Sequence, residues 1–189
     1  DVNVRGTAVL LEQLAKRRVR RLVVSSSMSI YGGEYVDADG RRTIVRERSL
    51  DRLRQGLWEL DDASGRPLTP VPTRESKTPV LESVYALTKF DQERLCLVMG
   101  RAYGIPTVAL RFFNVYGPRQ ALSNPYTGVL AIFASRLLNA RPPVLFEDGE
   151  QRRDFVSVHD VARACVLAVE RPDAIGRVFN VGSGESRRI

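Results

Sequence analysis

A tyrosine and a lysine lie four positions apart in the stretch Ser83–Lys89, where the sequence predicts the start of a helix. Positions i and i+4 share one helix face, with Cβ atoms about 5–6 Å apart, so the ammonium group of Lys89 is expected close to the phenol of Tyr85. A nearby cation favours the phenolate and lowers a tyrosine pKa from its ordinary value of about 10. This spacing therefore predicts a proton donor and acceptor that works near neutral pH. The same spacing is also common on solvated helix faces, so its meaning depends on the rest of the chain.

Hydroxyl side chains follow a short apolar run upstream. Leu22–Val24 predicts a buried strand, and Ser25, Ser26 and Ser27 come directly after it. Ligands of open α/β sheets collect at the carboxyl ends of the strands, so a serine there is placed to donate a hydrogen bond to a substrate oxygen. The alternative is a serine-rich turn whose hydroxyls bond to their own backbone.

Together, Ser25–Gly32 and Ser83–Lys89 resemble the extended short-chain dehydrogenase/reductase family, and within it the NAD-dependent nucleotide-sugar epimerases and dehydratases. The resemblance covers nearly the whole chain except residues 33–77. Three further stretches match the family in the same order: Asn3–Thr7, Leu110–Arg119 and Gly149–Phe155.

The resemblance implies an α/β fold with a Rossmann-like parallel sheet. Residues 1–117 would be the C-terminal part of the NAD-binding domain, with residues 33–77 as an irregular insertion loop near the active site. Residues 118–189 would be part of a small α/β substrate-binding region interleaved with it. The glycine-rich turn that opens the family's cofactor domain does not occur in the sequence, so we expect a chain truncated at both ends and inactive by itself.

The resemblance also implies roles for particular side chains. Ser27, Tyr85 and Lys89 would be catalytic. The cofactor NAD would be held by Tyr85 and Lys89 together with three further residues: Asn3, Ser25 and Phe112. The substrate, a dTDP- or UDP-sugar, would be held by Ser27 and by four others: Asn114 and Arg153 at its phosphates, and Val144 and Phe146 on a strand at its base.

The implied reaction is epimerisation at C4 through a transient 4-keto sugar. Dehydratases of the family carry an Asp-Glu pair directly after the residue that matches Ser27, whereas this chain has Met28 and Ser29, which argues against dehydration. Within the family, the chain is most similar to dTDP-L-rhamnose 4-epimerases, followed by UDP-glucose 4-epimerases. A nucleotide-sugar 4-keto reductase or dehydrogenase and a non-catalytic sugar-nucleotide-binding fragment remain as alternatives. The resemblance further implies a homodimer for the full-length protein.

Composition and charge also bear on whether the protein binds a membrane, nucleic acid or a metal. The 189 residues contain no apolar run of about 18, so no membrane span is expected. The net charge of +7 includes the basic run Lys16–Arg21, but no aromatic residues interleave with it as a nucleic-acid platform would need. Cys96 and Cys165 read as buried free thiols, which suits the reducing cytoplasm, and neither has neighbours at metal-ligand spacing. No nucleic acid, membrane or metal partner is predicted.

Periodicity and turn residues predict the elements that position these groups. The helix that bears Tyr85 should end at Gly104, with Val84, Leu87, Leu95 and Val98 pointing inward. Asp39-Gly40 and Ser64-Gly65 predict turns within the insertion. A loop is expected at 124–128. The other predicted elements are helices over 1–18 and 129–140 and strands over 21–26, 107–112, 144–146 and 177–181.

Overall fold

A three-stranded parallel sheet forms the centre of the computed structural model, which describes residues 1–189 apart from 18, 44, 46–47 and 123–127. Its strands are β1 (Leu22–Ser27), β5 (Thr107–Phe112) and β8 (Val178–Val181), in the order β1-β5-β8. The predicted α/β class with a parallel sheet is confirmed. The surrounding helical elements are η1 (Val2–Gly6), α1 (Thr7–Ala15), η2 (Met28–Ile30), α3 (Val84–Tyr103), α5 (Val158–Glu170) and η3 (Pro172–Ala174).

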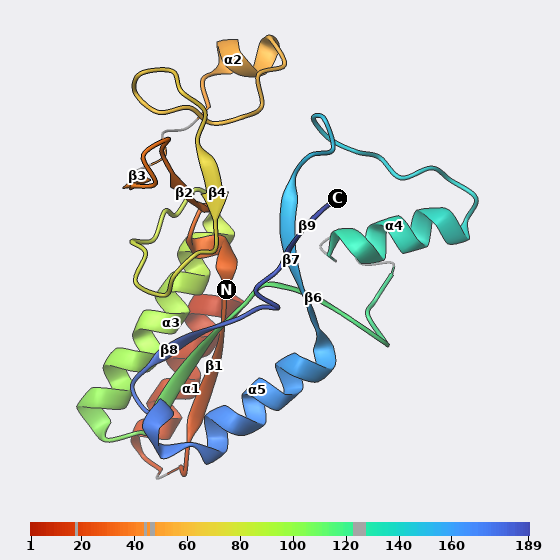
Figure 1. Ribbon diagram of the computed structural model, residues 1–189. Coiled ribbons are helices and arrows are strands. Elements are labelled where there is room, and N and C mark those ends of the chain that lie inside the picture. Colours follow the sequence, from red (N-terminus) through yellow and green to blue (C-terminus); the bar gives the residue numbers. More distant parts are fainter. Residues whose placement is uncertain (18, 44, 46–47, 123–127) are drawn as a thin grey trace.

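Helices cover both faces of this sheet, α1 and α3 on one side and α5 on the other (Figure 1). The side chains of β5 alternate between the two layers, as the two-residue period of a strand requires. Val108 and Leu110 belong to the core beneath α5, whereas Ala109 packs with Leu11 of α1 and Leu97 of α3. A strand that is buried on both faces has a continuous apolar sequence, and this is why β5 could be predicted from its residues.

Helix α3 begins and ends where its sequence predicts. The Ser83 hydroxyl accepts a hydrogen bond from the Ala86 amide at 3.0 Å, which caps the first turn. Gly104 ends the helix in the left-handed conformation, with φ of 66°.

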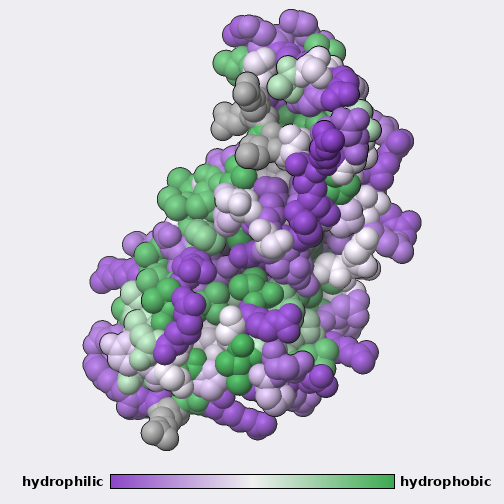
Figure 2. Space-filling model, turned by 60° about the vertical axis from the view of Figure 1, so that its left-hand side comes forward, coloured by the Kyte–Doolittle hydropathy of each residue, from purple (hydrophilic) through white to green (hydrophobic). Residues whose placement is uncertain are grey.

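The inward face of α3 was predicted wrongly. Val84, Leu87 and Val98 are exposed, and Leu95 alone of the predicted four packs partly against the core. The buried face contains two charged residues that find partners on the sheet, so apolar periodicity alone misidentifies it. That face consists of Ala86, Lys89, Glu93, Cys96, Leu97 and Gly100. Figure 2, which brings this side of the molecule forward, shows hydrophobic patches interspersed among hydrophilic side chains.

The insertion at residues 33–77 has regular structure, which corrects the expectation of an irregular loop. It contains β2 (Glu34–Val36), β3 (Arg42–Thr43), α2 (Leu50–Arg54) and β4 (Thr69–Val71). The strands form a separate antiparallel sheet in the order β3-β2-β4. This unit projects beyond the carboxyl ends of the central strands, with α2 at its far end (Figure 1).

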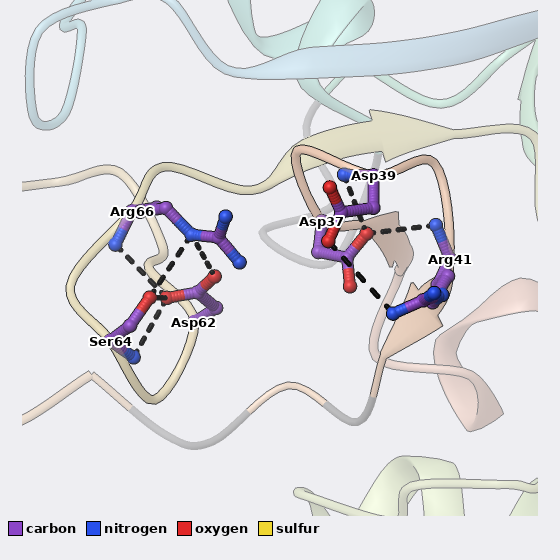
Figure 3. A network of polar contacts seen from close by, with 6 residues as sticks. All are labelled: Asp37, Asp39, Arg41, Asp62, Ser64 and Arg66. Atoms are coloured by element: carbon purple, nitrogen blue, oxygen red, sulfur yellow. Dashed lines mark hydrogen bonds and ion pairs between the residues drawn. The ribbon is translucent and has the colours of Figure 1, made fainter.

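Two similar turns close hairpins within the insertion, at residues 37–41 and 62–66 (Figure 3). In each, an aspartate side chain accepts hydrogen bonds from the backbone amides two and four positions later, at 2.8–3.0 Å. Gly40 and Gly65 adopt φ of 75° and 80°, which confirms the turns predicted from their dipeptides. Because the carboxylates of Asp37 and Asp62 are bonded to their own turns, these turns are organised locally rather than by an apolar core.

Glu34 of β2 connects parts of the insertion through ion pairs of its buried carboxylate. Its carboxylate pairs with Arg42 at 2.8 Å and with Arg74 at 3.0 Å, while its own side chain is 5% exposed. Burial by itself raises the pKa of Glu34, but hydrogen bonds from the amide and guanidinium of Arg74 and the charge of Arg42 outweigh it, so the pKa lies below its ordinary value.

We therefore expect the insertion to loosen in acid before the central sheet does. A carboxyl whose pKa is lower in the folded state stabilises that state fully above its unfolded value, about 4.3, and loses this contribution as pH falls through the folded value. Trp58, the single tryptophan, lies in the insertion, so its fluorescence between about pH 7 and about pH 3 reports the change. Glu34→Gln should weaken the insertion already at neutral pH and diminish the acid step, whereas Glu59→Gln should keep it. An identical acid step in Glu34→Gln and the unchanged protein would contradict this expectation.

A third sheet and a further helix lie on the other side of the molecule from the insertion (Figure 1). The strands β6 (Asn114–Tyr116), β7 (Arg152–Ser157) and β9 (Ser186–Arg188) pair in the order β6-β7-β9. Helix α4 (Val129–Leu138) matches the predicted helix over 129–140. The predicted strand over 144–146 is wrong, because this segment belongs to neither a strand nor a helix. The predicted loop at 124–128 lies outside the described residues except for Gly128.

Cys96 is buried in α3, and burial raises the pKa of its thiol to about 11, whereas Cys165 is only half-buried. Both thiols are free. Across the described ranges, no helix is both long enough and apolar enough to cross a membrane.

Candidate active site

Lys89 lies at the carboxyl end of β1, on the buried face of α3. Its ammonium group donates to the backbone carbonyl of Ser25 and to the side chain of Gln92, and only 8% of the residue is exposed. Burial lowers the pKa of Lys89. Gln92 in turn donates to the Thr7 hydroxyl at 3.0 Å, so α1 helps to orient the ammonium group. Lysine has three N–H donors and two are used here, which leaves one for a ligand.

Ser27 is the last residue of β1 and caps η2. Its hydroxyl oxygen accepts hydrogen bonds from the amide and the hydroxyl of Ser29 at 3.2 Å and 2.9 Å. The hydroxyl proton of Ser27 thereby remains available to a ligand, so the serine-rich turn and the ligand-binding interpretation are compatible. Tyr85 is in the first turn of α3, and 55% of the residue is exposed. The structure thus presents an exposed phenol one helical turn before a buried ammonium group.

The predicted cofactor residues occupy different environments. The Ser25 side chain is exposed at the carboxyl end of β1, and Phe112 is half-buried at the matching end of β5. Asn3, in η1, donates to the Thr88 hydroxyl at 3.2 Å, which ties η1 to α3 next to Lys89. These residues approach one edge of the parallel sheet from three elements.

A cleft of about 790 Å³ opens beside this edge. One wall consists of η2 and the insertion, including Ser29, Tyr35 and Arg48, and the other includes β7 and the turn at 182–184. Met28 also lines it, so both residues that replace the Asp-Glu pair of dehydratases face the cleft without a carboxyl group.

Asn114 and Arg153, both predicted to bind substrate, line this cleft. The Asn114 amide donates to the backbone carbonyl of Asp154 at 2.8 Å, which fixes it against β7. Arg153 donates to the Arg152 carbonyl and to the Gln151 side chain at 2.9 Å and 3.1 Å. In the described part of the chain neither Arg152 nor Arg153 pairs with a carboxylate, so both guanidinium groups can pair with an anionic ligand.

Val144 and Phe146 do not line the same cleft. They border a second, mainly apolar cavity of about 350 Å³ with Phe133 and Arg136 of α4. Phe146 is 75% exposed and Val144 is 46% exposed. The structure therefore separates these two from the other predicted substrate residues.

A buried polar network lies beneath the cleft. The Arg111 guanidinium pairs with both carboxylate oxygens of Glu93 at 2.8 Å and 2.6 Å, and it donates to the hydroxyl of Tyr31. The Tyr31 hydroxyl donates to the Asn180 side chain at 2.8 Å, and Arg111 also reaches the Glu75 carbonyl at 3.1 Å. The network therefore connects α3, β5 and β8 to the insertion.

Sequence reasoning missed several groups in the site. Gln92 and Thr7 orient the lysine, and Tyr35 and Glu82 line the cleft. The helical spacing of Gln92 from Lys89 was a usable signal, whereas the insertion residues come near the site only through tertiary packing. Within the described residues, no group of three or more His, Cys, Asp or Glu side chains is arranged to hold a metal ion.

Comparisons with known proteins agree with this arrangement. The model of the NAD dependent epimerase/dehydratase family matches residues 1–182. A dTDP-L-rhamnose 4-epimerase from Burkholderia thailandensis is 38% identical over all of this chain and 52% of its own length. The chain thus spans about half the length of this relative.

Solved structures give the same result. A UDP-glucose 4-epimerase from Thermotoga maritima, determined with UDP-glucose, is 32% identical with a TM-score of 0.74, covering 98% of this chain and 49% of that one. A UDP-glucuronic acid 4-epimerase from Bacillus cereus, determined with UDP-glucuronic acid and NAD, is 28% identical with a TM-score of 0.72. That match covers 99% of this chain and 48% of the Bacillus protein.

Proposed function

The chain belongs to the NAD-dependent epimerase/dehydratase family, and we propose that the whole protein epimerises C4 of a nucleotide-diphospho-sugar. The observation that carries this proposal is the position of Lys89, whose ammonium group is held at the carboxyl end of β1 on the helix that also bears Tyr85. This is the sheet edge at which α/β proteins bind their ligands.

In the proposed reaction Tyr85 removes the proton from the C4 hydroxyl and later returns it. The exposed phenol suits this role, because it is open to a ligand and has a cation one helical turn away. Ser27 donates its hydroxyl proton to the same sugar oxygen and holds the sugar for proton transfer. Lys89 would supply positive charge at the same end of the sheet.

The residues present fit NAD. Lys89 has one donor left after its bonds to Ser25 and Gln92, which suits a ribose hydroxyl. Ser25 and Phe112 offer a hydroxyl and an aromatic edge beside it, with Asn3 bordering the site. NAD, when bound, supplies the hydride acceptor and donor at C4. The protein's own part is to orient the sugar and to move the hydroxyl proton.

For the substrate, Arg153 and Asn114 would hold the diphosphate, since an arginine fork matches phosphate oxygens. Val144 and Phe146 would contact the base in the second cavity, where Phe133 adds an aromatic surface. The dTDP- and UDP-sugars remain the two candidate classes. The division into residues 1–117 and 118–189 is also a proposal, as is a homodimeric, cytoplasmic protein. The free, buried thiol of Cys96 supports the reducing compartment.

The proposed epimerisation can be tested by measuring whether NADH is released or consumed during turnover. We expect the whole protein to interconvert two C4 epimers of UDP-glucose or dTDP-rhamnose without net release or consumption of NADH, because the hydride leaves and returns. Chromatography of the sugar nucleotides, with absorbance of the reduced cofactor followed in parallel, measures both. Stoichiometric NADH turnover would indicate a reductase or dehydrogenase instead. Accumulation of a 4-keto-6-deoxy product would show that Met28 and Ser29 do not exclude dehydration.

A further inference from the structure

Four carboxylates line the large cleft, and three of them have partners. Glu34 pairs with two arginines, and Glu75 accepts a hydrogen bond from the Asn180 amide at 2.9 Å. Asp154 accepts bonds from the amides of residues 183 and 184 and from the Ser183 hydroxyl at 2.8–2.9 Å. Each of these groups therefore serves the architecture of the cleft wall.

The fourth carboxylate, Glu82, is exposed and has neither a hydrogen bond nor an ion pair in the described part of the chain. The charge of Glu82 acts on Lys77, but the ammonium group of Lys77 donates to the carbonyls of Tyr31 and Thr78, so no direct contact in the described residues commits the carboxylate of Glu82 to the fold. The carboxylate of Glu82 is therefore available to contact a ligand in the cleft.

Glu82 lies beside the segment that follows η2. The segment that carries it runs alongside η2, because the Val80 amide donates to the Ile30 carbonyl at 2.8 Å. One carboxylate oxygen of Glu82 lies 3.8 Å from the position that a Cβ on Gly32 would take. Glu82 thus lies close to the chain that leaves Ser27, and it precedes Tyr85 by three residues.

Positive charge is concentrated on the other wall. Arg152 and Arg153 project from β7 without a carboxylate partner in the described residues, whereas Arg48 already pairs with Glu147 at 3.0 Å. The cleft therefore offers, on β7, cations without a carboxylate partner where a diphosphate would bind, and, beside the segment that follows η2, an anion without an ion pair in the described residues.

We propose that Glu82 is a specificity-determining residue that selects nucleotide sugars with an uncharged sugar ring over those with a uronic acid. The inference rests on the proposed function and adds the charge class of the substrate to it. The carboxylate accepts a hydrogen bond from a sugar hydroxyl, and it repels a sugar carboxylate brought into the same end of the cleft. Discrimination of this kind combines a favourable contact with an unfavourable one for the competitor.

UDP-glucose and UDP-glucuronic acid test this charge selection, since they differ only in the group at C6. Isothermal titration of the whole protein, loaded with NAD, gives the Kd of each, with UDP alone as the reference. We expect UDP-glucose to bind at least about tenfold more tightly than UDP-glucuronic acid, because like charges juxtaposed in an interface strongly disfavour binding. In Glu82→Gln this ratio should fall to about one, and Kd for UDP alone should stay unchanged.

Glu170→Gln is the matched control, since it makes the same charge change on an exposed residue at the end of α5. It should keep the ratio of the unchanged protein. If UDP binds but the ratio does not respond to Glu82→Gln, or if the unchanged protein prefers UDP-glucuronic acid, the role of Glu82 is overturned while the proposed function stands. If neither UDP nor either UDP-sugar binds, and dTDP-sugars do not bind either, both proposals fail together.

Discussion

Tyr85→Phe is expected to lower kcat of the whole protein by at least about a hundredfold, with little change in Kd for the sugar nucleotide. The substitution removes only the phenolic oxygen, which in the proposed reaction takes the C4 hydroxyl proton and gives it back. The ring stays on α3, and because 55% of the residue is exposed, loss of the hydroxyl leaves no unsatisfied buried group behind. Turnover from saturating substrate and titration of the sugar nucleotide separate the two quantities.

Tyr103→Phe provides the control, since Tyr103 lies on the same helix at its far end and is similarly exposed. It should retain full activity. A Tyr85→Phe protein that kept half of its turnover would assign the proton transfer to another group.

Arg111→Met is expected to destabilise the protein by about 3–5 kcal/mol, because it leaves the carboxylate of Glu93 buried without its cation. The two side chains are 6% and 1% exposed, so water cannot replace the missing partner. The same substitution removes the hydrogen bond to the Glu75 carbonyl, which helps to attach the insertion. Urea unfolding measures the loss, and Trp58 fluorescence reports whether the insertion detaches.

Two further variants separate the charge effect from the packing effect. Arg111→Met combined with Glu93→Met should recover much of the lost stability, since apolar residues of similar volume often replace a buried ion pair without loss. Arg101→Met, at an exposed position of α3, should be nearly neutral. A single Arg111→Met variant as stable as the unchanged protein would contradict the importance assigned to the buried pair.

Local signals determined much of the fold. The apolar run of β5, the cap at Ser83 and the glycine at 104 identify the central strand and the limits of α3, because caps and strand runs depend on neighbouring residues. The residues Ser27, Tyr85 and Lys89 were identified from two short motifs together with the family resemblance that these motifs carry. Their catalytic roles remain a prediction.

The buried face of α3 shows where such reasoning fails. Apolar periodicity favoured Val84, Leu87 and Val98, yet the buried positions include Lys89 and Glu93. Burial of an unpaired charge is costly, and here the partners come from β1 and from β5, 64 and 18 residues away along the chain. A sequence window around the helix does not contain that information.

Tertiary structure also decided what the insertion contributes. Its two turns were readable, because Asp-Gly-type dipeptides and aspartate side chains act within five residues. Its sheet was not readable, since β2 pairs with β4 across more than 30 residues of polar sequence. The same long-range pairing brings Tyr35 and Arg48 to the cleft, whereas Val144 and Phe146 face a separate cavity. Short motifs and the resemblance they carry thus identified the candidate catalytic residues, and only the packing of distant segments formed the walls of the neighbouring cleft.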